Sequence, residues 1–206
     1  MTSIVLGHGS GFIKAGFEGE DHPRTVFPSA VGTRRISITN PLRCGEWNRT
    51  DDNMKTSYVG DEAQSMRGVL SLKYPIQHGV VTNWNDMETI WQHTFSHELR
   101  VDTTQYPVLM PEKPSNSTAS KEKMIQVMFE SFRVPSMSIV VESVLSLFAS
   151  GRTSGIVLEC GHGVCTSVPI LKGSIQRHAV LESNLCGGTM TEYMIQMLVN
   201  KGYFFS

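Results

Sequence analysis

This sequence has no long apolar run, almost no net charge and only four cysteines. No apolar stretch approaches the length of a membrane span, and residues 1–6 lack the basic start of a signal peptide, so we expect a cytoplasmic protein without a membrane partner. The formal net charge of −1 provides no basic field, and we expect no nucleic-acid partner. The four cysteines are then expected to be reduced thiols.

What remains is the composition of a globular chain. With 206 residues, 40% of them hydrophobic and 18% charged, the chain can bury one sizeable core or two small ones. Cys160, Cys165 and Cys186 could be drawn as a zinc site, but their spacing matches no common zinc finger. We therefore predict no metal site there and interpret these cysteines as strand-packing residues.

Glycine marks the most informative pattern, which occurs twice. Residues 155–169 read as two strands joined by a tight glycine turn, and residues 3–17 repeat this pattern. When Gly9 is laid on Gly161 and Gly11 on Gly163, the preceding Ile-Val-Leu runs nearly superpose. Glycine turns allow successive N–H groups to face an anion. The repeat favours paired phosphate-binding hairpins; ordinary tight hairpins are the alternative.

The short sequence segments around these hairpins are more specific than the glycines. On the basis of these segments, the chain resembles actin. The resemblance implies an α/β, ribonuclease H-like fold of mixed β-sheets and helices. It also implies a first domain over 1–150 and an incomplete, truncated second domain over 151–206. The matching segments run in order through the chain: Lys14–Phe17, Val26–Ser29, Ser57–Gln64, Leu72–Ile76, His78–Trp84, Glu98–Val101, Leu145–Leu147 and Ala149–Thr153.

Local patterns predict the elements between the hairpins. Thr, Asn, Pro, Arg and Asp dominate residues 32–57, which predicts an extended surface loop where the family has a shorter flexible one. Caps and apolar periodicity place the other elements. These are a helix opened by Asn85, a strand at 101–110, a polar loop at 111–119, a helix capped by Ser120, a strand at 137–141, a helix at 143–150, a strand at 175–181 and a last helix capped by 189–192.

The resemblance implies a nucleotide site between the two hairpins, with ATP as the ligand. In the first loop, Ser10 and Lys14 match the family's phosphate-contacting serine and lysine. The remaining residues implied to bind nucleotide are Gly9, Gly11, Phe12, Gly161, Gly163 and Val164.

Several positions depart from the family's catalytic pattern. Gly7 and His162 stand where the resemblance implies aspartates, and Glu159 is one methylene longer than a third aspartate. Because Mg²⁺ requires ordered oxygen ligands, we expect weak magnesium binding or none. Glu142 stands at the position of the family's water-orienting glutamine and Thr166 at that of a histidine. Decay of the site is the favoured interpretation; a Glu142 base with a raised pKa is the alternative.

These departures favour a divergent actin-like cytoskeletal protein with a structural or interaction role and little or no ATP hydrolysis. A polymerising ATPase and a truncated fragment without independent function are the alternatives. The resemblance implies actin or actin-binding proteins as partners, with incorporation into filaments. Phe148, Ala149, Gly151 and Thr153 match one wall of the family's groove for partner helices.

Overall fold

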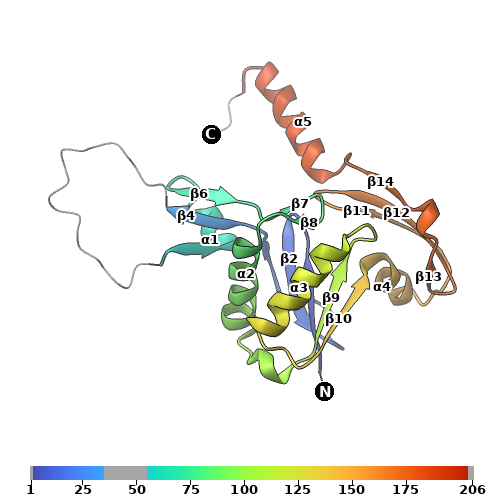
Figure 1. Cartoon of the computed structure of the whole chain (residues 1–206). Helices are drawn as coiled ribbons and strands as arrows, with labels where there is room; N and C mark the ends of the chain where they lie inside the picture. The colour runs from blue at the N-terminus through green and yellow to red at the C-terminus, as the bar shows by residue number, and fades with distance from the viewer. Residues whose placement is uncertain (1, 35–54, 204–206) are drawn as a thin grey trace.

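The computed structural model describes residues 2–34 and 55–203, and a five-stranded sheet forms its centre (Figure 1). The strand order is β10-β9-β1-β2-β3. β1, β2 and β3 pair antiparallel, whereas β9 pairs parallel with both β1 and β10. The sheet is therefore mixed, as the predicted fold class requires. Its strands are β1 (Ile4–His8), β2 (Phe12–Phe17), β3 (Thr25–Pro28), β9 (Val108–Glu112) and β10 (Met137–Val141).

The main core lies between this sheet and two helices, α2 (Trp84–His93) and α3 (Thr118–Glu130) (Figure 1). Strand side chains alternate between faces, so Ile4 and Leu6 of β1 point the same way, and both are fully buried. Both helices bury apolar residues in the same cluster. The buried helix residues are Met87, Ile90, Trp91, Met124, Val127 and Met128.

Both helices begin earlier than the sequence predicted. Asn83, and not Asn85, caps α2, because its side chain accepts a hydrogen bond from the amide of Asp86 at 3.1 Å. Ser117 caps α3 and leaves Ser120 inside the helix. α2 continues into a π-helix at Thr94–Leu99. The predicted strand at 101–110 is largely wrong, because a 3₁₀ helix (Thr103–Gln105) precedes β9, which itself continues into the predicted polar loop.

A three-stranded sheet lies beside the central one, with strand order β5-β4-β6. Its presence corrects the prediction of a loop over 32–57, because residues 32–34 belong to a strand and residue 57 begins another. Residues 35–54 of that predicted loop, including Cys44, lie outside the described part of the chain. The elements here are β4 (Val31–Arg34), β5 (Ser57–Val59), α1 (Gly60–Ser65), β6 (Leu70–Lys73), β7 (Ile76–Gln77) and β8 (Val80–Val81).

The second glycine hairpin forms a separate four-stranded sheet with its own small cluster of Leu147, Val168 and Ile170. The predicted strand at 175–181 is wrong, because the 3₁₀ turn Arg177–Ala179 interrupts it. The domain boundary near residue 150 stays a prediction. The elements are α4 (Glu142–Ala149), β11 (Gly155–Cys160), β12 (Cys165–Leu171), β13 (Ser174–Ile175), β14 (Leu181–Ser183) and α5 (Gly187–Asn200).

The last helix, α5, projects away from the rest of the chain (Figure 1). It begins at Gly187, two residues before the predicted cap, because Cys186 is the N-cap and Thr189 completes its capping box. No residue of α5 is buried. Across the described ranges, no helix is long and apolar enough to cross a membrane.

Candidate functional site

The two glycine loops have the same local geometry. The amide of Gly9 donates to the carbonyl of Phe12 at 3.1 Å, and the amide of Gly161 donates to the carbonyl of Val164 at 3.0 Å. A Cβ placed on Gly9 or on Gly161 would lie 3.0 Å from the same carbonyl, a contact so tight that the carbonyl would have to shift by a few tenths of an ångström. The repeat seen in the sequence is therefore a repeat of structure, with β1–β2 and β11–β12 as its copies.

The two loops touch each other directly. A Cβ on Gly163 would lie 2.5 Å from the Ser10 hydroxyl oxygen, and one on Gly11 would lie 2.9 Å from the Cβ of His162. Glycine is required at both positions, because any larger side chain would push the loops apart. In this conformation the tips of the loops face one another across a van der Waals contact.

The segment between β7 and β8 connects the two loops. The Ser10 hydroxyl accepts a hydrogen bond from the amide of Gly79 at 2.9 Å. The Nδ1 atom of His78 donates to the carbonyl of Gly163 at 2.8 Å. His78 has a φ of 50°, in the left-handed region, and Gly79 follows with a φ of 74°. This turn therefore contacts both loops, the second through His78 and the first through Gly79.

A cavity of about 410 Å³ opens beside the contact between the loops. Lys14 of β2 and Thr166 of β12 line it from the two hairpins. Every residue predicted at the nucleotide or catalytic site lines this one cavity. The fold therefore brings together residues that are far apart in the sequence. The lining includes Gly9, Ser10, Gly11, Phe12, Lys14, Glu142, Glu159, Gly161, His162, Gly163, Val164 and Thr166.

Two carboxylates dominate the α4 side of the cavity. Glu159 accepts hydrogen bonds from the hydroxyls of Ser143 at 2.5 Å and Ser146 at 3.1 Å, which fixes its orientation. Glu142 is exposed and lines the cavity. Its surroundings raise the pKa of its carboxyl, first by partial burial and then by the negative charge of Glu159, while Lys14 opposes the shift. The wall is therefore acidic, with both carboxylates in mutual electrostatic reach.

His8 ends β1 at the back of the same cavity. Burial lowers the pKa of its imidazole to about 4, so the ring is neutral at pH 7. Its ring meets Trp91 edge to face, with centroids 6.3 Å apart. His8 thus contributes a neutral, packed ring to a position where the resemblance implies an asparagine.

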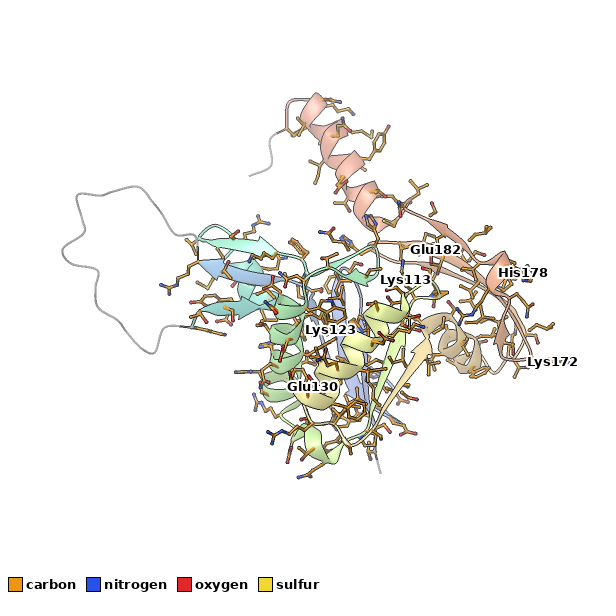
Figure 2. The ribbon with its side chains drawn as sticks, in the orientation of Figure 1. Lys113, Lys123, Glu130, Lys172, His178 and Glu182 are labelled. Carbon is orange, nitrogen blue, oxygen red and sulfur yellow. The ribbon has the colours of Figure 1, made fainter. Side chains whose placement is uncertain are left out.

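The residues at and just after the end of β9 also line the cavity, although no sequence motif indicated them. Glu112 ends this strand, is buried, and accepts hydrogen bonds from Lys121 at 2.5 Å and Asn116 at 3.2 Å. Lys113 forms an ion pair of 3.6 Å with Glu182 of β14, and Figure 2 shows the two side chains near one another. The carboxyl ends of adjacent parallel strands meet at one sheet edge, and this rule could have identified both residues.

The four residues predicted to line a partner groove gather at the end of α4. Phe148 and Ala149 are exposed in its last turn, and Gly151 follows with a φ of 74°. The carbonyl of Thr153 accepts a hydrogen bond from the amide of Gly173 at 2.7 Å. The ring of Phe148 lies over Gly173, 3.4 Å from where a Cβ would stand. These residues form one exposed patch.

The structure thus combines a mixed α/β sheet with two glycine hairpins that meet beside a cavity. The family model described as Actin matches residues 1–204. This chain belongs to the actin family.

The cavity residues fit the two components of a metal–nucleotide complex differently. Backbone N–H groups of glycine loops and Lys14 are suitable donors for phosphate oxygens. The nearby carboxylates already have partners in the chain, because Glu112 is paired with Lys121 and Glu159 accepts hydrogen bonds from two serines. Within residues 2–34 and 55–203, no group of three or more His, Cys, Asp or Glu side chains could hold a metal ion.

Proposed function

We propose that this chain is a divergent actin-family protein with a structural or interaction role in the cytoskeleton and little or no ATP hydrolysis. The observation that carries the proposal is the placement of Glu142 beside Glu159 on the cavity wall. Phosphoryl transfer depends on positioning and on stabilising negative charge, and an acidic wall opposes both. The partners in this proposal are actin or actin-binding proteins.

The chemistry of Glu142 supports the loss of hydrolysis. A glutamine can donate and accept hydrogen bonds at once and so orient a water molecule, whereas an ionised carboxylate only accepts. An ionised Glu142 would also repel the phosphates. Ser10, the serine that matches the family's phosphate contact, accepts a hydrogen bond from the Gly79 amide, and its hydroxyl hydrogen can still donate to a phosphate oxygen. The residues of this chain thus provide donors for phosphate oxygens without the glutamine that would orient the attacking water.

The interaction role rests on the exposed end of α4. Phe148 exposes 49% of its surface, although it is a large aromatic residue, and Thr153 lies beside it across the Gly173 contact. Exposed aromatic residues commonly anchor partner proteins. A cytoplasmic partner that docks an amphipathic helix here would fit the partner groove that the resemblance to actin implies.

Thermal unfolding of the purified chain with and without ATP and magnesium tests the nucleotide part of the proposal. A ligand at a hundredfold excess over its dissociation constant would stabilise the folded chain by about 2.7 kcal/mol. We expect no magnesium-dependent shift and no release of phosphate above a protein-free blank. A magnesium-dependent rise in Tm together with phosphate release would replace the proposal with its alternative, a polymerising ATPase.

Co-sedimentation with actin filaments tests the partner part. We expect the chain to pellet with filaments, and we expect Phe148→Ala to reduce the pelleted fraction. Phe129→Ala is a matched control, because Phe129 is also an exposed phenylalanine on a helix but lies on α3. Equal pelleting by all three proteins would remove the α4 patch from the proposal, and absence of pelleting would contradict binding to filaments.

A further inference from the structure

Two cysteines face each other at the tip of the second hairpin. Cys160 is the last residue of β11 and Cys165 is the first of β12, and the two are direct partners in the antiparallel register. Their sulfur atoms lie 3.1 Å apart. Both thiols are free, and Cys160 is exposed. They are therefore positioned against each other before any bond forms between them.

The strand pairing places the two backbones at a distance that a disulfide can span. The Gly161 amide bonds the Val164 carbonyl, so the cysteine pair next to it is a non-hydrogen-bonded pair. Residues in such pairs have Cα atoms about 4.5 Å apart. Disulfides span about 4.4 to 6.8 Å between Cα atoms. The bond would form without moving either strand.

We propose that Cys160 and Cys165 form a reversible redox site that is oxidised by hydroperoxides to a cross-strand disulfide. The bond would close the loop at 161–164, which contains the glycine that touches Ser10 of the first hairpin. Oxidation would thereby fix the width of the second loop at its contact with the first. This inference concerns the chemistry of the thiols and holds whether or not the cavity binds nucleotide.

The two steps of the oxidation balance with hydrogen peroxide as the oxidant; an organic hydroperoxide would release an alcohol in place of the first water. The thiolate of Cys160 attacks one peroxide oxygen, the O–O bond breaks, and the leaving hydroxide takes up a proton to become water, leaving a sulfenic acid. The sulfur of Cys165 then attacks the sulfenic sulfur, the S–O bond breaks, and the hydroxyl leaves as water with the thiol proton. Two thiols and one peroxide yield one disulfide and two waters.

The surroundings assign the first step to Cys160. The hydrogen bond shared with Cys160 is the main reason that the pKa of Cys165 is raised, and a raised pKa disfavours its thiolate. Cys165 is also less exposed, which suits the residue that resolves the sulfenic acid. Among the described residues, Cys186, buried at the start of α5, is the other cysteine that could pair with either thiol. A test must therefore separate the pair from Cys186.

Tryptic mass spectrometry of the full chain makes this separation. Cleavage after Arg152 and Lys172 releases a fragment, residues 153–172, that contains Cys160 and Cys165 and no other cysteine. The reduced chain is treated with dilute hydrogen peroxide, its remaining thiols are alkylated, and it is digested. We expect this fragment to be lighter by two hydrogen atoms and to escape alkylation. After reduction with dithiothreitol and a second alkylation, it should carry two alkyl groups.

Variants and denaturant provide the controls. Cys186→Ser should leave the mass change intact, whereas Cys160→Ser and Cys165→Ser should each abolish it. In concentrated urea the bond should form more slowly, because the hairpin no longer holds the thiols together. Alkylation of both thiols in the oxidised folded chain, a bond from either cysteine to Cys186, or an equal rate in urea would each overturn the proposal.

Discussion

The two glycine hairpins share one local pattern but occupy opposite environments. Ile4 and Leu6 of β1 are 0% exposed, whereas their counterparts in β11, Ile156 and Leu158, are 73% and 69% exposed. The strands, the closing hydrogen bond and the glycines are alike in both. The comparison shows that a hairpin motif determines local backbone geometry, while its surroundings decide which face of the strand is buried.

The difference has a cause in how each strand is covered. In β1, the side that carries Ile4 and Leu6 contributes to the core that α2 and α3 complete. In β11 the intervening residue, Val157, packs against the small cluster around Leu147. Since strand side chains alternate, packing Val157 inward turns Ile156 and Leu158 outward. Glu159 comes two residues after Val157, so its side chain points to the same face of the strand, where it forms part of the cavity wall.

Truncating the paired leucines is the largest test of this comparison. Leu6→Ala removes a fully buried side chain and should cost about 2 to 5 kcal/mol of unfolding free energy. Leu158→Ala should change it by less than about 0.5 kcal/mol, because that side chain is exposed. Urea unfolding followed by circular dichroism measures both. A cost of several kcal/mol for Leu158→Ala would mean that this face is covered in solution and would end the contrast.

The loop ends also differ, because His8 stands where the second hairpin has Cys160. The pKa of His8 is lowered from 6.5 to about 4 in the folded chain. The unfolded chain therefore binds more protons between these values, and stability is full above pH 6.5 and falls as the pH drops toward 4. The loss is about 1.4 kcal/mol for each unit of pKa difference. Urea unfolding across this range should show a smaller pH slope for His8→Gln.

A control for this prediction is His178→Gln, which changes an exposed histidine, labelled in Figure 2, that does not line the cavity. It should leave the pH slope as it is in the unmodified chain. An unchanged slope in His8→Gln would contradict the burial of His8 as the cause.

The repeat was predictable from the sequence because it is local. Glycine spacing and the Ile-Val-Leu runs determine a hairpin by themselves, so its two copies could be aligned through Gly9 and Gly161. Helix starts were less predictable, because Asn83 and Asn85 both offer caps and only packing of the helix selects one. The position of Glu112 depends on the parallel pairing of β9 with β1, and these strands are distant in sequence.

Contact between the loops likewise depends on tertiary structure that no local pattern contains. Nothing near Gly163 in the sequence indicates that Ser10 will lie against it. The nucleotide and catalytic positions were assigned by resemblance, residue by residue, and the fold gathers them around one cavity. Their roles stay predictions.

Adding a side chain at Gly163 tests whether the two hairpins touch in solution. Gly163→Ala places a Cβ 2.5 Å from the hydroxyl oxygen of Ser10, so the loops must separate or strain. Overpacking of this kind costs about 1 to 3 kcal/mol. Gly68→Ala is the matched control, because a Cβ there meets nothing within 4 Å. Thermal unfolding should show a lower Tm for Gly163→Ala alone. Equal Tm values for both variants would show that the loops stand apart.

The smallest expected effect concerns the charge on the cavity wall. Glu142→Gln removes one of two neighbouring carboxylates and leaves Lys14 to act on an anion with less opposition. Two charges about 4 Å apart in water interact by about 1 kcal/mol, which corresponds to about fivefold in a dissociation constant. We therefore expect tighter ATP binding by Glu142→Gln in a fluorescent-nucleotide titration. Glu122→Gln, an exposed change on α3, should have no effect. Equal affinities for both variants would mean that the acidic wall does not limit nucleotide binding.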